Sequence, residues 1–444
     1  MSSFASRFGV YVHFPYCLSK CPYCDFASVA ATSIPHERYA KAIEAELEVR
    51  VREFFPEPKA SERKEEPCSS RARESILPTS GGAVDSRQEH GRPATGVESL
   101  YFGGGTPSLW EPRCVGAVIR AVDRLFGLAP GCEITLEANP GASDAARFSE
   151  LRAVGVNRLS IGVQSFHPRI LAGLGRRHSG PEAMAAYESA RRAGFDNVSL
   201  DLIFGGPGQD PLMARADVDE AIRLGPDHLS CYGLTLEGLA EEVRLAKDVK
   251  RGRVRVPDDA AQEEMGRLVR DSLAEAGYRR YEISNFSKPG FESRHNTLYW
   301  LGREYVAAGC GAHGFLRTDT GGIRYGNPRK PEAWLAAVEA GGPPEVERDE
   351  IAPDELFEER IFLGLRLVDG VDLEEAAADT IGALPPGVLE AADELATKGL
   401  LVREGSRVRC TDRGFDFHTE VAIRLLPEEP APAKKRAEPL VVLS

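Results

Sequence analysis

Three cysteines near the start of the chain have the residue type and spacing to hold a metal cluster. Cys17, Cys21 and Cys24 lie in the run HFPYCLSKCPYCDFAS, with three and then two residues between successive thiols. Three thiolates on one short loop can bind three irons of a four-iron cubane, which leaves the fourth iron open to a cofactor or substrate. The alternatives are a disulfide pair and a structural zinc site. Zinc needs a fourth protein ligand, for which Asp25 and His13 are poor candidates.

A glycine run is the second candidate for ligand binding. The run YFGGGTPSLW at 101–110 follows an expected strand and precedes an expected helix. Consecutive glycines allow a ligand to approach backbone amides and carbonyls without a Cβ in the way. Taken alone, the same run is also compatible with a plain tight turn between a strand and a helix.

Polar side chains follow three further expected strands. They are Glu137 in TLEANPG, Gln164 in SIGVQSF and Asp201 in LDLIFGGPGQ. The carboxyl ends of parallel barrel strands form one rim, so we expect these side chains to meet the cysteine loop at a common site. Each one alone could instead be a helix cap or a surface residue. Arg176, in LGRRHS, has the forked guanidinium that binds a carboxylate with two hydrogen bonds.

The elements that must position these residues follow an alternating pattern. Strand-like apolar runs alternate with amphipathic helical stretches up to about residue 236, which is typical of βα units and a parallel sheet. Strands are expected at 10–13, 99–102, 133–137, 158–163, 199–204 and 228–234, and helices at 112–126, 144–154, 181–193 and 211–224. Six units fit an incomplete barrel. A doubly wound sheet is the alternative, because periodicity alone cannot separate the two.

Two segments interrupt or follow this pattern. The stretch 56–96 is rich in proline, serine, glycine and charge, and it cannot bury enough apolar surface to offset the cost of ordering, so we expect a disordered insertion there. From about residue 351 the pattern changes to helices and a short hairpin, which indicates a winged-helix-like domain up to residue 426, followed by a flexible tail at 427–444. The second helix of the winged-helix-like domain is carboxylate-rich, which favours a lid or docking role over DNA binding.

Composition narrows the classes of protein. The chain has 444 residues, is 42% hydrophobic and carries a formal net charge of −13, which argues against broad nucleic-acid binding. No apolar run approaches the roughly 18 residues that cross a bilayer, and the first strand begins too early for a signal peptide. These features predict a cytoplasmic protein. The other cysteines show no metal-ligand spacing and are expected to be reduced, at 68, 114, 132, 231, 310 and 410.

The cysteine spacing, with the aromatic Tyr23 before the last thiol, resembles the signature of radical S-adenosylmethionine enzymes. In that superfamily the methionyl amine and carboxylate bind the open iron, and an electron from the reduced 4Fe-4S cluster cleaves the sulfonium. The resemblance implies an incomplete (βα)6 TIM-type radical SAM barrel over residues 1–236, completed by residues 237–350. It also implies that the GGGTP run contacts the methionyl amino group.

The full set of motifs resembles the coproporphyrinogen III dehydrogenase superfamily. The motifs are YVHFPYCLSKCPYCDF, FGGGTPS, LEANP, IGVQSF, GRRHS, DLIFGGPGQ, YEISNF and RHNTLYW, and they span the chain outside the insertion and the tail. The resemblance implies that a first S-adenosylmethionine is contacted by Tyr11, Gly104, Glu137 and Arg176. It implies that positions for a second one are Tyr23, Gly105, Thr106, Gln164, Asp201 and Thr235.

Two features point to one branch of this superfamily. The dehydrogenase carries a cysteine where this chain has Phe26, and it has a long N-terminal arm before the cluster, whereas Cys17 lies almost at the start here. In their place stands the motif H-N-x-x-Y-W at 295–300, which resembles the HemW heme chaperones. This resemblance implies that the protein binds heme and transfers it to acceptor proteins. The alternative is oxidative decarboxylation of porphyrinogen propionates, which both departures count against.

The resemblance directs attention to residues that could contact heme. A histidine can bind heme iron, and aromatic side chains offer flat apolar faces to a porphyrin. His295 is the first candidate for the iron ligand and His313, in GAHG, the second. A His-Asn pair is also a common loop hydrogen-bond network. Arginines near the motif could meet the propionates, at positions 294, 303 and 324. The implied partners are a heme acceptor protein and a reduced flavodoxin or ferredoxin-type donor.

Overall fold

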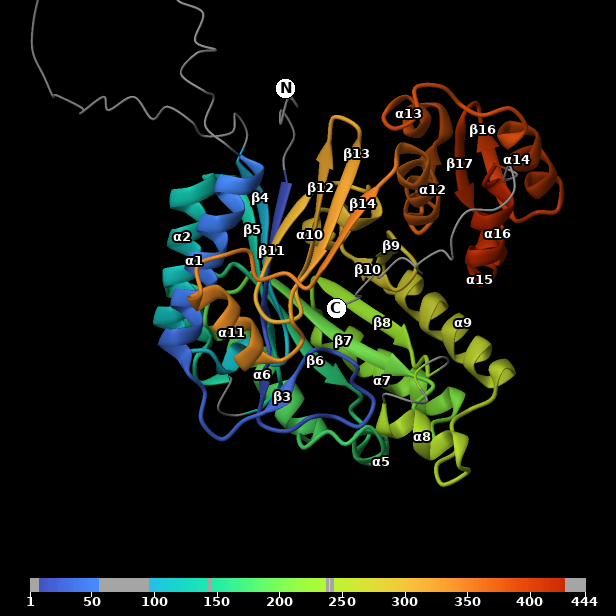
Figure 1. Ribbon diagram of the computed structural model, residues 1–444. Coiled ribbons are helices and arrows are strands. Elements are labelled where there is room, and N and C mark those ends of the chain that lie inside the picture. Colours follow the sequence, from blue (N-terminus) through green and yellow to red (C-terminus); the bar gives the residue numbers. More distant parts are fainter. Residues whose placement is uncertain (1–7, 56–95, 142–144, 237–238, 240–242, 428–444) are drawn as a thin grey trace, which may run out of the picture.

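A mixed sheet of twelve strands forms the centre of the protein (Figure 1). The computed structural model describes residues 8–55, 96–141, 145–236, 239 and 243–427. Seven adjacent strands run parallel, in the order β11 (Tyr305–Ala308), β1 (Phe8–Phe14), β4 (Val97–Gly104), β5 (Leu128–Ala138), β6 (Arg158–Gln164), β7 (Asn197–Phe204) and β8 (His228–Gly233). Among the described strands the two ends of the sheet do not pair with each other, so the parallel part is an open barrel.

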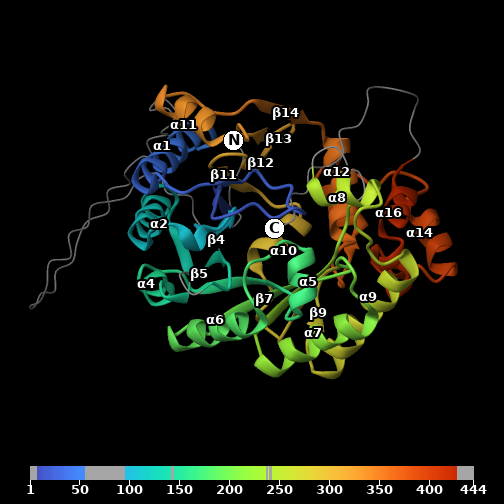
Figure 2. The same cartoon turned by 90° about the horizontal axis from the view of Figure 1, so that it is seen from below.

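The order of the strands separates the two expected folds. From β1 to β8 the neighbours in space follow the order in the sequence, without the reversal that defines a doubly wound sheet. Figure 2 shows the helices along the outer side of the strands. They are α1 (His36–Phe54), α2 (Pro112–Phe126), α4 (Phe148–Ala153), α6 (Gly180–Arg192), α7 (Pro211–Leu224) and α9 (Asp259–Glu275). The incomplete barrel is therefore confirmed, and the doubly wound alternative is wrong.

The structure matches the predicted strands closely and corrects several details. All six predicted strands are present, and α2 and α7 have the predicted bounds. Strand β5 begins at Leu128 rather than at residue 133, and α4 begins at Phe148, whereas the predicted start at Asp144 lies outside the described residues. The predicted insertion lies outside them as well, except for Gly96, which precedes β4. The tail is outside them from residue 428 onward.

The segment after β8 adds strands to both edges of the sheet. It begins with the short helix α8 (Arg244–Lys250), whereas the short helix α5 (Pro168–Gly173) lies earlier in the chain, between β6 and β7. One edge gains β10 (Asn285–Ser287) and β9 (Arg279–Arg280), which are antiparallel. The other edge gains a seventh parallel strand, β11, which pairs with β1, and then the antiparallel strands β12 (His313–Thr318), β13 (Gly321–Gly326) and β14 (Glu347–Ile351). Two helices connect these strands, α10 (Arg294–Trp300) and α11 (Pro331–Glu339).

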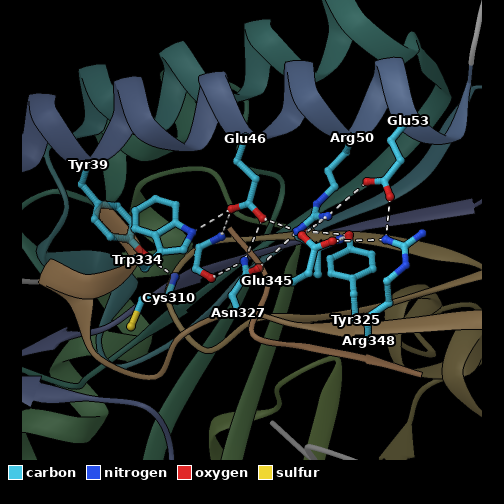
Figure 3. A network of polar contacts seen from close by, with 12 residues as sticks. Tyr39, Glu46, Arg50, Glu53, Cys310, Tyr325, Asn327, Trp334, Glu345 and Arg348 are labelled. Atoms are coloured by element: carbon cyan, nitrogen blue, oxygen red, sulfur yellow. Dashed lines mark hydrogen bonds and ion pairs between the residues drawn. The ribbon is translucent and has the colours of Figure 1, made fainter. Parts of the chain in front are cut away.

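A buried polar network joins α1 to this second edge (Figure 3). Glu46 and Arg50 form a fully buried ion pair, with Nη2 and Oε1 3.0 Å apart. Glu46 also accepts hydrogen bonds from the Asn327 side chain and from the Trp334 indole, and Arg50 lies over the ring of Tyr325 at 3.9 Å. Buried charges are tolerated only when they are paired and hydrogen-bonded, and both conditions hold here. The network therefore fixes the added strands against the first helix.

The C-terminal part has its own apolar core. Its elements are α12 (Pro353–Gly364), β15 (Val371–Asp372), α13 (Leu373–Ala378), α14 (Val388–Thr397), β16 (Leu401–Glu404), β17 (Arg407–Cys410), α15 (Asp412–Asp416) and α16 (His418–Leu425). A helix, a short strand, two helices and a hairpin follow one another, which is the winged-helix order that the sequence predicts. Apolar side chains from these helices and strands form one cluster, among them Phe357, Ile361, Leu395 and Val408.

Candidate functional site

The three predicted cluster cysteines lie on one loop beside the mouth of the barrel. Cys17 ends the short strand β2 (Tyr16–Cys17), which pairs with β3 (Val29–Ala30), and Cys21 and Cys24 lie on the loop between these strands. All three thiols are free. This rules out the disulfide alternative in this structure.

Each thiol has a polar neighbour from a different part of the fold. Thr106 Oγ1 donates to Cys17 Sγ at 3.5 Å, and Ser28 Oγ lies 3.8 Å from Cys24 Sγ. Arg176 Nη1 donates to Cys21 Sγ at 3.8 Å. Hydrogen bonds and a nearby cation favour the thiolate form that iron requires. Burial opposes it by raising the pKa of Cys17 and of Cys24, so binding of iron must displace their protons.

The donor set fits a cubane better than a single ion. Within the described residues, no three histidine, cysteine, aspartate or glutamate side chains are placed to hold one metal ion. A preformed zinc site is therefore not found there. In a cubane each thiolate binds a different iron, so the three sulfurs need not converge on one point.

The glycine run packs against the residues that precede the cysteine loop. Gly105 N donates to Phe14 O at 2.7 Å, and Thr106 N donates to Tyr16 O at 3.0 Å. Gly104 has a φ of +113°, and a Cβ there would lie 2.6 Å from the ring of His13. The run is therefore more than a connecting turn, because it sets the position of the cysteine loop relative to β4.

Glu137 is placed close to the glycine run by its strand. Its Oε2 accepts a hydrogen bond from Gly104 N at 3.0 Å, and its Oε1 accepts one from the Tyr101 hydroxyl at 2.9 Å. Burial, together with the charge of Asp201, raises the pKa of Glu137 to about 7. A carboxyl with this pKa can hold or release a proton near neutral pH, and a bound cation would favour its charged form.

Arg176 reaches the cysteine loop through a residue that sequence reasoning missed. Its Nη2 donates to Asn139 Oδ1 at 2.6 Å and to Gly162 O at 2.5 Å. Asn139 Nδ2 in turn donates to Thr106 Oγ1 at 2.9 Å. Asn139 lies two residues after Glu137 in the LEANP motif, and this position in the motif could have identified it as a site residue.

The turn that carries Arg176 also touches the cysteine loop directly. Gly175 has a φ of +67°, and a Cβ there would lie 2.4 Å from Cδ of Pro22. Tyr23, the next residue on the loop, is near the Arg176 guanidinium, and burial raises the pKa of its hydroxyl. The predicted meeting of these motifs with the cysteines is therefore present in the fold.

The other predicted residues lie at different depths. Gln164 ends β6 with a φ of 64°, and it is the one non-glycine residue with positive φ among the described residues. Such strained backbone often marks a functional position. Asp201 lies in the middle of β7 rather than at its end, where it accepts hydrogen bonds from Ser160 and Ser199. Thr235 is exposed and donates to Gly233 O.

A pocket opens beside Tyr11 and Phe26, between the barrel and the C-terminal domain. Its open space is about 1040 Å³, a figure that includes the solvent at its mouth. Aromatic side chains form much of its wall, and arginines lie around it. The lining residues that matter below are Tyr11, His13, Phe26, Tyr299, Tyr305, His313, Phe315, Leu363, Arg303, Arg317, Arg324 and Arg360.

His295 does not present a nitrogen to this pocket. It is buried, with 1% of its surface exposed, and its Nδ1 lies 2.8 Å from Ser99 Oγ while its Nε2 lies 2.9 Å from the Tyr299 hydroxyl. Its ring also stacks on Tyr101. The predicted role as an iron ligand would require one of these hydrogen bonds to break. The histidine therefore holds Tyr299 in the pocket wall.

The other candidates for heme contact fall into those that line the pocket and one that does not. His313 lines the pocket, with its Nε2 3.6 Å from Glu347 Oε2. Arg303 and Arg324 also line it. Arg294 does not belong to the lining, and its Nη1 donates to the carbonyl of Gly131.

Comparison with known proteins fits this geometry. The model of the radical SAM superfamily matches residues 83–224, and that of the HemN C-terminal domain matches residues 351–417. A protein of Mycobacterium tuberculosis (strain CDC 1551 / Oshkosh) named heme chaperone HemW is 33% identical over 410 residues, covering 92% of each chain. The protein of the same name from Escherichia coli (strain K12) is 33% identical over 92% of this chain and 95% of its own. The chain belongs to the HemW family.

A solved structure has the same fold as this chain. Coproporphyrinogen III oxidase (HemN) from Escherichia coli, described as a radical SAM enzyme, aligns with a TM-score of 0.73 at 18% identity, over 96% of this chain and 91% of that one. At this identity the likeness concerns the fold alone. Within the described residues no helix is long and apolar enough to cross a membrane.

Proposed function

We propose that the protein binds heme and delivers it to an acceptor protein, with a 4Fe-4S cluster and S-adenosylmethionine as its cofactors. One observation carries the proposal: a pocket with many aromatic side chains in its wall lies directly beside the cysteine loop. Tyr11, His13 and Phe26 from the cysteine side and Tyr305 and Phe315 from the added strands line the same pocket. Flat aromatic walls favour a flat apolar ligand.

The cluster and its cofactor would be held by the residues around the loop. Cys17, Cys21 and Cys24 would each bind one iron, and the open iron would bind S-adenosylmethionine, which supplies a route to one-electron chemistry. Glu137 and Gly104 would meet the amino group, and Arg176 would meet the carboxylate.

The positions proposed for a second S-adenosylmethionine lie around the same mouth. Thr106 and Gly105 are part of the glycine run, and Tyr23 lies against Arg176. The strained backbone of Gln164 supports a ligand contact there. Asp201 is deeper in the barrel and Thr235 is exposed, so these two are the least supported by the structure.

We place the iron contact of heme at His313 rather than at His295. His313 lines the pocket, whereas both nitrogens of His295 are engaged in hydrogen bonds. An imidazole nitrogen is a common axial ligand of heme iron. We also propose that the protein works in the cytoplasm, because the eight cysteines among the described residues are all free.

Substitution of the two histidines tests this assignment. His313→Ala should change the Soret band of the heme complex, and His295→Ala should leave the band in place while lowering thermal stability. The reverse result would return the ligand role to His295. Supplied with reductant and S-adenosylmethionine, the wild-type protein should not decarboxylate coproporphyrinogen III, since Phe26 stands where the dehydrogenase carries a cysteine. Robust cluster-dependent turnover would favour the oxidase function instead.

A further inference from the structure

Three arginines meet where the barrel contacts the C-terminal domain. Arg303 follows α10, Arg317 lies on β12 and Arg360 lies on α12, and all three line the pocket. They surround the turn at Leu301 and Gly302. Arg360 Nη1 donates to Leu301 O, and Arg317 Nη2 donates to Gly302 O at 3.4 Å. We call these three side chains the arginine junction.

The positive charge of the junction is only partly compensated. Arg303 has Glu98 at 3.4 Å, and Arg360 has Asp379 at 3.9 Å, whose side chain is 50% exposed. The Arg317 Nη1 donates to the backbone carbonyl of Asp379 at 3.2 Å rather than to its carboxylate. Both ion pairs are longer than an ordinary hydrogen bond, and the guanidinium of Arg317 donates to backbone carbonyls, so carboxylates do not saturate the three guanidinium groups.

Two further observations single out Arg360. Its Nε is buried and has no hydrogen-bond partner among the described residues. Burial and the neighbouring charge of Arg317 lower the pKa of Arg360. A buried donor without a partner is costly, so the polar surroundings of this side chain are incomplete in this structure. By contrast, Arg324 already pairs with Glu359 at 2.8 Å.

We propose that the arginine junction binds the carboxylates of the tetrapyrrole, and that the bound ligand thereby ties the C-terminal domain to the barrel. The inference rests on the proposed function and names the recognition group of that site. Guanidinium forks match carboxylates geometrically, whereas the aromatic wall takes the ring. Because Arg303 and Arg317 belong to the barrel side and Arg360 to α12, one ligand with two carboxylates can bridge both parts.

Porphyrins without iron test the carboxylate contact apart from iron ligation. Protoporphyrin IX carries two carboxylates, and its dimethyl ester carries none. The full-length wild-type protein should bind the diacid at least about ten-fold more tightly than the diester, as expected for lost charge-assisted hydrogen bonds. Arg303→Gln and Arg317→Gln should weaken binding of the diacid and leave binding of the diester nearly unchanged. Arg360→Gln should do the same if it folds.

A matched variant controls for net charge. Arg424 lies on α16, half exposed and paired with Glu420, outside the pocket. Arg424→Gln should bind both porphyrins like the wild type. Amide hydrogen exchange in α12 should slow with the diacid and not with the diester, because only the diacid can bridge the two parts.

The possible outcomes distinguish failure of this inference from failure of the proposed function. Equal affinity for diacid and diester, or variants at Arg303 and Arg317 that bind the diacid like the wild type, would overturn the arginine junction and leave porphyrin binding intact. Unchanged exchange in α12 with a tightly bound diacid would overturn the link between the domains. Binding of neither porphyrin would contradict the proposed function as well.

Discussion

Arg176 and Asn139 are joined by a hydrogen bond of 2.6 Å, and this contact links the two sides of the cysteine loop. Arg176 reaches Cys21 at 3.8 Å, and Asn139 reaches Thr106, which donates to Cys17. Four elements thus contribute to one chain of polar contacts that ends on two thiols. The position of one asparagine therefore affects both the cluster ligands and the arginine proposed to bind the cofactor carboxylate.

Removal of this asparagine should weaken cofactor binding without loss of iron. Asn139→Ala removes one of the contacts that hold Arg176, which keeps Gly162 O and Cys21, and should lower the affinity for S-adenosylmethionine about ten-fold, the size of one charge-assisted hydrogen bond. Titration of the reduced cluster by electron paramagnetic resonance measures this affinity. Asn157→Ala is the control, because Asn157 bonds to Cys132 O away from the loop. Equal affinity in the Asn139 variant and the wild type would refute the link.

The cluster ligands can be separated from the other cysteines. Cys17→Ala, Cys21→Ala or Cys24→Ala should abolish the 4Fe-4S cluster after anaerobic reconstitution, because each thiolate binds a different iron. Cys310→Ala should keep its iron, since Cys310 is buried, has a free thiol and follows β11 instead of belonging to the loop between β2 and β3. Iron content and the visible absorption spectrum report the result. A Cys310 variant that loses iron equally would show that the ligand assignment is wrong.

Glu137 should make stability fall as the pH rises. Its pKa is raised from 4.5 to about 7, so between these values the folded state holds a proton that the unfolded state has lost. Each additional bound proton in the folded state lowers the free energy of unfolding as pH increases, here by at most about 3 kcal/mol in total. Glu137→Gln should flatten this part of the profile.

Urea unfolding of the cluster-free protein between pH 5 and 8 measures the effect. The difference between wild type and variant isolates Glu137, because other buried carboxyls such as Asp201 have raised pKa values in both proteins. Parallel profiles for the two proteins would contradict the assigned environment of this carboxyl.

The buried pair in the network of Figure 3 should contribute strongly to stability. Glu46→Ala removes one of two close carboxylates from the buried Arg50, which keeps Glu345 at 2.8 Å, and takes the acceptor from Asn327 and Trp334; it should cost about 3–5 kcal/mol in the free energy of unfolding. Glu53 also contacts Arg50 but is partly exposed, so Glu53→Ala should cost about 1 kcal/mol or less. Urea denaturation compares the two variants. Similar losses in both would mean that the buried pair does not anchor the added strands to α1.

The sequence predicted the barrel better than the site. The strands predicted at 10–13 and 158–163 are short apolar runs between turns, and the local pattern suffices to place them. Strand β11 was not predicted individually, because its partner β1 lies about 300 residues earlier and no local signal marks that pairing. The motif residues Glu137 and Arg176 lie at the rim of the barrel, as the sequence pattern predicts. Asn139 was missed, since an asparagine before a proline is equally typical of a turn.

Histidine roles could not be settled by spacing. His295 and His313 both occur near aromatic residues in the sequence, but only the fold shows that Ser99 and Tyr299 occupy both nitrogens of His295. The pocket itself was not predicted, because its wall combines residues from many segments, among them β1, α10, β12 and α12. A site assembled from segments far apart in the sequence leaves no periodic pattern in any one of them.

Binding of heme to a protein with a filled pocket tests the central claim most directly. Leu363 lines the pocket from α12, and Leu363→Trp should occupy part of its space, whereas Leu212, with 79% of its surface exposed on α7, provides the matched control Leu212→Trp. Titration with hemin under anaerobic conditions, followed by the Soret band, gives the affinity of each protein. We expect one heme per chain for the wild type and for Leu212→Trp, and at least about ten-fold weaker binding for Leu363→Trp. Equal binding by all three proteins would place heme elsewhere, and no binding in either redox state would contradict the account.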